Sequence, residues 1–225
     1  MPWIEIAVGV GIALLVGLLA LVYFADRIGY ARGLKQIAAV GAVSIAQAPD
    51  GQPIRITGRV RLIDGGLTSP VSQRPCAAWR VEVGQLQRNE HGAWMSDPYE
   101  IGEKHRCVDF FLEDTSGVAR VDASSVELFM PVTPVAHAGK AEADAICERL
   151  EAGEGAVAVR EGGGVYKFRE GTLDAAERVT VTGVARWEDA PDEPGGAYRG
   201  GGRRLVVRAP TDGVVRISDD PEVTR

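Results

Sequence analysis

Hydrophobic and polar residues follow three different patterns along the chain. Residues 4–24 are apolar except for Glu5, and a helix of this length rises about 1.5 Å per residue and spans the hydrocarbon core of a bilayer. The next stretch is rich in Ala and is compatible with a helical stalk. Strand-like alternation begins at Ile54. We therefore predict a transmembrane helix over 1–25, a juxtamembrane stalk over 26–50 and a β-domain over 51–220.

The β-domain is predicted from short apolar alternations between turn signals. The residues 114–117 (DTSG) read as a tight turn between two such alternations, and residues 140–152 are the one good short helix. Many short strands without an alternating helix favour a mainly β fold with a barrel-like or sandwich-like, OB-like soluble domain. The alternating positions are Ile54, Ile56, Val60 and Leu62, then Trp79, Val81 and Val83, then Val108, Phe110 and Leu112.

Two fragments of the β-domain resemble each other, residues 54–58 (IRITG) and residues 179–183 (VTVTG). Each ends in a glycine, and a glycine in such a place marks a bulge or a sharp bend where a strand curls. Two copies indicate recurring strand chemistry and not a repeat.

The charges beside the apolar segment predict its orientation. Arg27, Arg32 and Lys35 follow it and no basic residue precedes it, which places the C-terminal side in the cytoplasm. We expect a single-pass protein of the cell membrane with its N-terminus outside. A cleaved signal peptide is the alternative, but it lacks a basic start and a convincing cleavage site. Three cysteines are too few and odd in number for a disulfide framework, which fits a cytoplasmic domain.

The first predicted partner is the lipid bilayer. Gly9, Ala13 and Gly17 form a stripe of small residues on one helix face, which permits helix–helix pairing, although small residues are common in such spans. The net charge of −6 gives the chain as a whole no broad positive field, so we expect no nucleic acid partner.

The sequence offers no catalytic constellation. His105 and Cys107 share a face if they lie on a strand, and with Cys76 they are a weak candidate for a metal-dependent or cysteine-dependent hydrolase. Acidic pairs at Glu113–Asp114, Glu142–Asp144 and Asp219–Asp220 fit solvated turns or helix faces better than acid–base catalysis. We predict no metal, no cofactor and no catalytic residue.

The most unusual stretch is residues 66–83 (GLTSPVSQRPCAAWRVEV), where two prolines stiffen a loop that leads into a Trp–Arg strand start. A stiff connection between two strands accounts for it, but a rigid loop beside an exposed Trp and Arg is also a good surface for a partner. The candidate binding residues are Ser69, Pro70, Gln73, Arg74, Cys76, Trp79 and Arg80.

The order of these features resembles the GIDE domain, also called the BAM (beside-a-membrane) domain. The resemblance covers roughly residues 54–218 and is sharpest in SPVSQRPCAAWRVEV at 69–83 and LEDTSGVARVD at 112–122, after a membrane anchor and ITGRV at 56–60. The family includes membrane-anchored ubiquitin ligases of mitochondria and chloroplasts and prokaryotic relatives. The resemblance implies a β-rich domain held at a membrane.

This sequence departs from the ligase pattern in two ways. A RING needs paired Cys and His ligands for two zinc ions, whereas this chain has three cysteines, three histidines and no CxxC pair. No apolar run follows Ile217, so the family's second transmembrane helix is not present, and we expect a variant or a truncated sequence. We predict a non-catalytic interaction or scaffold module for a membrane or cytosolic protein. The alternative is a ubiquitin ligase whose RING lies beyond residue 225 or on a partner.

Overall fold

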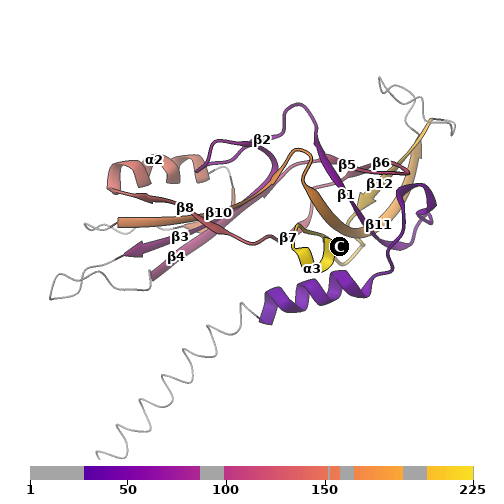
Figure 1. The fold of residues 1–225 in the computed structure, drawn as a ribbon, viewed down its shortest axis with the longest axis horizontal. Helices are drawn as coiled ribbons and strands as arrows, with labels where there is room; N and C mark the ends of the chain where they lie inside the picture. The colour runs from indigo at the N-terminus through magenta and orange to yellow at the C-terminus, as the bar shows by residue number, and fades with distance from the viewer. Residues whose placement is uncertain (1–27, 87–98, 152, 158–164, 190–201, 225) are drawn as a thin grey trace, which may run out of the picture.

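The computed structural model describes residues 28–86, 99–151, 153–157, 165–189 and 202–224. They form two β-sheets with few helices (Figure 1). Within this part of the chain, every helix is too short or too polar to cross a bilayer. The predicted span over 4–24 and the stripe of Gly9, Ala13 and Gly17 lie outside the described residues.

Five strands close into a barrel, which confirms the prediction of a mainly β domain. Their order is β1–β5–β6–β12–β11, and β11 pairs back with β1 to close the ring. Every pairing is antiparallel except β6 with β12, which run parallel. The strands are β1 (Pro53–Leu62), β5 (Phe110–Asp114), β6 (Gly117–Val121), β11 (Arg178–Asp189) and β12 (Arg203–Arg208).

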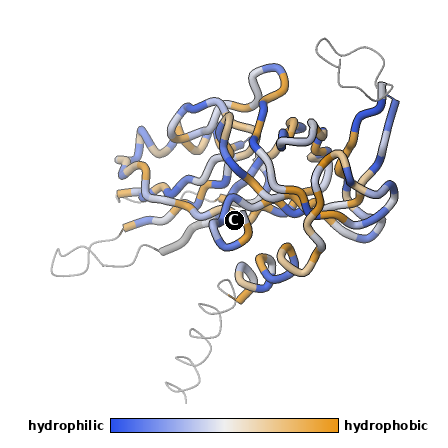
Figure 2. The backbone as a smooth tube through the Cα atoms, turned by 45° about the vertical axis from the view of Figure 1, so that its right-hand side comes forward, coloured by the Kyte–Doolittle hydropathy of each residue, from blue (hydrophilic) through white to orange (hydrophobic). Residues whose placement is uncertain are grey.

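The alternation in the sequence decides which side chains fill the barrel. Along β1, Ile54, Ile56 and Val60 are buried in the core, while the arginines between them point outward. Full burial of each such aliphatic side chain contributes about 1.5–3 kcal/mol. Hydrophobic and hydrophilic positions alternate along the strands in Figure 2.

The two similar fragments of the sequence are partners in the closed barrel. Ile54 lies opposite Gly183 and Gly58 opposite Val179 in the β1–β11 ladder. A Cβ at Gly58 would lie 2.6 Å from the carbonyl oxygen of Glu113, and one at Gly183 would lie 2.7 Å from that of Arg208. Both glycines therefore let a neighbouring strand approach closely. The β1–β11 register passes both of them without the shift that the predicted bulge would give.

The predicted turn at 114–117 joins β5 to β6. The Asp114 carboxylate accepts hydrogen bonds from the backbone N–H groups of Ser116 (2.6 Å) and Gly117 (2.9 Å), and from that of Ile45 (2.9 Å). Burial alone would raise the pKa of Asp114. A hydrogen bond of 2.7 Å from the Ser116 hydroxyl, followed by these backbone bonds, outweighs it and holds the pKa below its usual value. Ile45 begins a short 3-10 helix, η1 (Ile45–Gln47).

The barrel sheet continues past β11 into β13 (Val215–Ser218) and β7 (Val126–Phe129). The second sheet has the order β8–β10–β3–β4–β9, with the short strand β2 beside β3. Its strands are β2 (Leu67–Thr68), β3 (Pro75–Leu86), β4 (Tyr99–Cys107), β8 (Thr133–Ala138), β9 (Glu154–Val157) and β10 (Val165–Asp174). The chain enters this sheet after β1 and after β7, and it returns to the barrel through β5 and β11.

The predicted middle helix is confirmed as α2 (Lys140–Leu150), which covers one face of the second sheet (Figure 1). Its buried residues Ala143, Ile146 and Leu150 pack with side chains of β3 and β10, among them Trp79 and Tyr166. The opposite face of this sheet is charged, because Arg80 projects there and forms ion pairs with Glu82 and Glu103.

The helix over residues 28–39 lies against the barrel near the last helix, α3 (Pro221–Thr224) (Figures 1 and 2). Leu34 and Ile37 are buried with Phe129 and Val223. At its C-terminal end, Arg55 of β1 donates a hydrogen bond of 3.2 Å to the carbonyl oxygen of Ala38. An arginine at this end of a helix also interacts favourably with the helix dipole. The predicted stalk is therefore packed onto the β-domain from residue 30 onward.

Candidate binding surface

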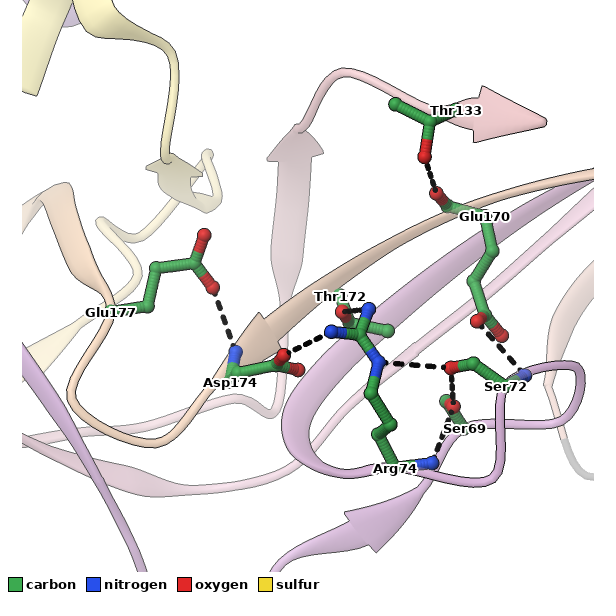
Figure 3. Close-up of polar contacts among 8 residues, drawn as sticks. All are labelled: Ser69, Ser72, Arg74, Thr133, Glu170, Thr172, Asp174 and Glu177. Atoms are coloured by element: carbon green, nitrogen blue, oxygen red, sulfur yellow. Dashed lines mark hydrogen bonds and ion pairs between the residues drawn. The ribbon is translucent and has the colours of Figure 1, made fainter. Parts of the chain in front are cut away.

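The predicted binding stretch ran from residue 69 to residue 80, and residues 75–80 of it lie in β3. The loop over residues 69–74 connects β2 to β3 and lies over strand β10 (Figure 3). The backbone N–H of Ser69 donates to the carbonyl of Arg74 at 2.9 Å, which closes the loop at its base. The Ser69 hydroxyl bonds that of Ser72 at 2.8 Å and accepts from the Arg74 N–H at 3.1 Å. The loop thus satisfies most of its own polar groups near its base.

A buried carboxylate holds the tip of the loop. Glu170 of β10 is only 3% exposed, and its two oxygens accept hydrogen bonds from the backbone N–H groups of Val71 (3.0 Å) and Ser72 (3.1 Å). A carboxylate that receives two backbone donors is a strong, geometrically specific anchor. Figure 3 shows the Glu170 side chain pointing toward the loop.

Arg74 fastens the other side of the loop to the same strand. One terminal nitrogen of its guanidinium forms an ion pair of 2.7 Å with Asp174, and the other donates to the Thr172 hydroxyl at 2.9 Å. Its Nε donates to Ser72 at 3.2 Å. The Arg74 side chain is still 54% exposed, so solvent reaches it while its geometry stays fixed.

Gln73 occupies the turn of the loop with a positive φ of 57°. Its side-chain amide donates to the carbonyls of Ser69 and Pro70, both at 3.0 Å. Arg149 of α2 donates to the Pro70 carbonyl at 2.7 Å. These bonds offset the cost of a left-handed backbone at a residue other than glycine.

The structure divides the predicted binding residues into two groups. Ser69, Pro70, Cys76 and Trp79 are buried, so they support the loop and do not face a partner. The expectation of an exposed Trp79 is wrong, because this side chain is 2% exposed and packs under α2. Gln73 and Arg74 are exposed.

Arg80 faces away from the loop. It lies on the charged face of the second sheet, where its guanidinium binds both carboxylate oxygens of Glu103 at 2.7 and 2.8 Å. Trp79 and Arg80 therefore project to opposite faces, as neighbours in a strand must.

The burial of Glu170 could have been predicted from the spacing of residues in the sequence. Tyr166, Phe168 and Glu170 are alternate residues of β10 and all three are buried. A carboxylate in phase with two aromatic residues of a strand is predicted to point into the protein, where it needs hydrogen-bond donors.

His105 and Cys107 do not form a reactive pair. The His105 Nε2 lies 3.8 Å from the Glu154 carboxylate, and the Cys107 thiol donates to the Val108 carbonyl at 3.6 Å. Burial raises the pKa of the Cys107 thiol to about 12 and that of Cys76 to about 12. A nucleophilic thiolate needs the opposite shift. The described residues contain no group of three His, Cys, Asp or Glu side chains placed to hold a metal.

A small pocket of about 300 Å³ lies between α2 and the β4–β9 edge of the second sheet. Cys147 lines it together with Lys104 and three acidic side chains, Asp144, Glu148 and Glu151. Burial, and to a smaller extent Asp144, raises the pKa of the Cys147 thiol above its usual value. The thiol is therefore protonated at neutral pH and is not activated as a nucleophile.

Asp219 has an environment that the sequence did not reveal. One of its carboxylate oxygens is buried and has no hydrogen-bond partner among the residues that the structure describes. Burial, followed by the charge of Glu177, raises its pKa to about 7. The prediction that this acidic pair sits in a solvated turn is therefore wrong for Asp219. Its neighbour Asp220 accepts a hydrogen bond from Tyr30 instead.

No protein-family model, curated protein or solved structure matches this chain. Its function is therefore inferred from its own residues and their geometry.

Proposed function

We propose that this protein is a non-catalytic, membrane-anchored interaction module that presents the loop over residues 69–74 to a protein partner. The observation that carries the proposal is the fixed conformation of this loop, which Glu170 and Arg74 tie to strand β10 at both its tip and its base. A binding loop that is already ordered loses little conformational entropy when a partner binds.

The surface that the loop offers is polar. Gln73 and Arg74 are its exposed side chains, with Thr68 and Pro75 exposed beside them. An arginine held in place by an ion pair and two hydroxyl groups is a favourable contact residue, because its guanidinium is already oriented. The partner is a membrane or cytosolic protein.

The membrane part of the proposal depends on the sequence. The apolar segment over 4–24 anchors the chain, and the basic residues that follow it place the β-domain in the cytoplasm. Membership of the GIDE family is likewise proposed from the sequence. The OB-like character of the barrel is also a proposal, and the five strands closed by the β1–β11 pairing support it.

A photo-crosslinking amino acid in native membranes tests the loop. Pro75 is the best position, because it is exposed and its replacement removes none of the hydrogen bonds that hold the loop, whereas replacing Gln73 removes two. Asp212, exposed in another loop, is the control position. We expect one defined crosslinked species from Pro75 and none from Asp212. Equal crosslinking at both positions would mean that the loop is only a structural connection.

Carbonate extraction and protease protection test the anchor and its orientation. We expect the chain to stay in the membrane fraction and the β-domain to be cleaved only when protease reaches the cytoplasmic side. A β-domain that is protected on that side would reverse the proposed topology.

A further inference from the structure

The outer face of the barrel carries a cluster of arginines around one aromatic ring. Phe111 of β5 points outward, since its neighbours Phe110 and Leu112 fill the core. The Arg61 guanidinium lies 4.5 Å from the centre of the Phe111 ring and that of Arg204 lies 5.7 Å from it. Arg61 and Phe111 are direct cross-strand partners, and Arg120 is the partner of Phe111 on its other side.

The barrel strands are basic although the whole chain is acidic, with a net charge of −6. Their nine arginines outnumber their four acidic residues, so positive charge is concentrated on this part of the fold. The arginines are Arg55, Arg59, Arg61, Arg120, Arg178, Arg186, Arg203, Arg204 and Arg208, and the acidic residues are Glu113, Asp114, Glu188 and Asp189.

Arg61 presents its positive charge to solvent on this surface. Within the described part of the chain it is exposed and forms neither a hydrogen bond nor an ion pair, and its contact is with the Phe111 ring. Arg120, by contrast, donates from Nε to Asp109 at 3.0 Å. A guanidinium that stacks on a ring keeps its N–H groups directed outward in the plane that suits a carboxylate.

We propose that the surface formed by Arg61, Phe111, Arg120 and Arg204 binds an acidic peptide segment of a protein partner. The inference rests on the proposed role of this protein as an interaction module, and it adds a second contact surface of defined chemistry. Arg61 supplies the free charge and Phe111 fixes its orientation. Carboxylates on an extended segment accept paired hydrogen bonds from such a guanidinium.

Two other anionic partners fit the geometry less well. A single-stranded nucleic acid stacks its bases on exposed aromatic faces, but Arg61 already covers a face of Phe111. A lipid surface attracts clusters of several unpaired basic residues, whereas Arg120 of this surface is already paired with Asp109.

Fluorescence anisotropy with fluorescein-labelled deca-glutamate tests this surface on the full chain in nanodiscs at low salt. We expect Arg61→Gln to weaken binding at least fivefold. Arg106→Gln removes the same charge from an exposed position on β4 and is expected to change binding less than twofold. Arg61→Lys keeps the charge but lacks the paired N–H groups of the planar guanidinium, and we expect about threefold weaker binding. Circular dichroism checks that each variant is folded.

Two kinds of result would overturn this inference. If deca-glutamate does not bind, or if Arg61→Gln and Arg106→Gln weaken it equally, the surface is not a site for acidic peptides. If a twelve-residue oligothymidine or vesicles with phosphatidylserine bind more tightly, and in an Arg61-dependent way, the ligand is a nucleic acid or a lipid and the inference is wrong. None of these results changes the crosslinking expected at Pro75, so the two proposals fail separately.

Discussion

The Tyr30 hydroxyl donates a hydrogen bond of 3.0 Å to the carboxylate of Asp220, although 190 residues separate them in the sequence. Burial, followed by this hydrogen bond, raises the pKa of Tyr30 above its usual value. The Tyr30 ring also makes an edge contact with Phe129, with 6.0 Å between ring centres. These contacts fix the helix that follows the predicted anchor to residues near the C-terminus of the chain.

Removing the Tyr30 hydroxyl is predicted to loosen this helix. We expect Tyr30→Phe to reduce the free energy of unfolding by about 1 kcal/mol, since a half-buried hydrogen bond to a carboxylate is lost and the ring contact stays. Amide hydrogen exchange over residues 28–39 should become faster while exchange in the barrel strands changes little. Gln36→Ala, at an exposed position of the same helix, is the control. Unchanged exchange in Tyr30→Phe would show that the hydrogen bond does not hold the helix.

Glu170→Gln is predicted to release the binding loop. Glutamine keeps one acceptor oxygen but places an NH₂ group against a backbone N–H, so one buried donor loses its partner. We expect a loss of about 1–3 kcal/mol in the free energy of unfolding. Limited proteolysis should cut within residues 70–74 faster than in the wild type. Glu113→Gln, at an exposed position, should leave both measurements unchanged.

Asp219 predicts a pH dependence of stability. Its folded-state pKa of about 7 lies above the usual value of 3.8, so folding favours the protonated form. The loss of folding stability from the ionised Asp219 is absent below about pH 4, grows as the pH rises toward 7 and is constant above that. We therefore expect Asp219→Asn to stabilise the protein at pH 8 more than at pH 4, by on the order of 1 kcal/mol after allowance for solvent screening.

Urea denaturation at the two pH values measures this difference directly. Glu177 faces the same region, and burial, ahead of the charge of Asp174, raises its pKa in the same direction. Glu177→Gln should therefore reduce the effect of Asp219→Asn. A stabilisation by Asp219→Asn that is equal at both pH values would contradict the account.

The close approach at Gly58 predicts a steric effect on the barrel. A Cβ there would meet the Glu113 carbonyl at 2.6 Å, and backbone cannot move away cheaply, so Gly58→Ala should cost about 1–3 kcal/mol. Gly29, on the helix over 28–39, has no atom within 4 Å of such a Cβ. Gly29→Ala is expected to stabilise the protein by up to about 1 kcal/mol. Thermal unfolding compares the two, and a neutral Gly58→Ala would disprove the packing argument.

The strands were predictable where alternation is local. Ile54 and Ile56, the turn at Asp114 and the helix from Lys140 to Leu150 all follow from spacing within a few residues. The β1–β11 closure was not predicted, because a pairing across more than a hundred residues leaves only the resemblance of the two fragments as a trace.

The candidate loop was less predictable than the fold. Trp79 and Arg80 are neighbours in a strand, so they project to opposite faces of the sheet. The pattern does not say which face α2 covers, and α2 buries Trp79. Glu170 and Asp174 lie about a hundred residues from the loop that they hold. Only the folded sheet brings them together.

The most direct test of the central claim joins the crosslinker at Pro75 with the Glu170→Gln substitution in native membranes. If the partner recognises the fixed loop, the Pro75 crosslink should fall several-fold in Glu170→Gln, while the amount of membrane-bound protein stays the same. A crosslink that is equally strong with and without Glu170, or no stronger at Pro75 than at Asp212, would contradict the proposal that this loop is the binding surface.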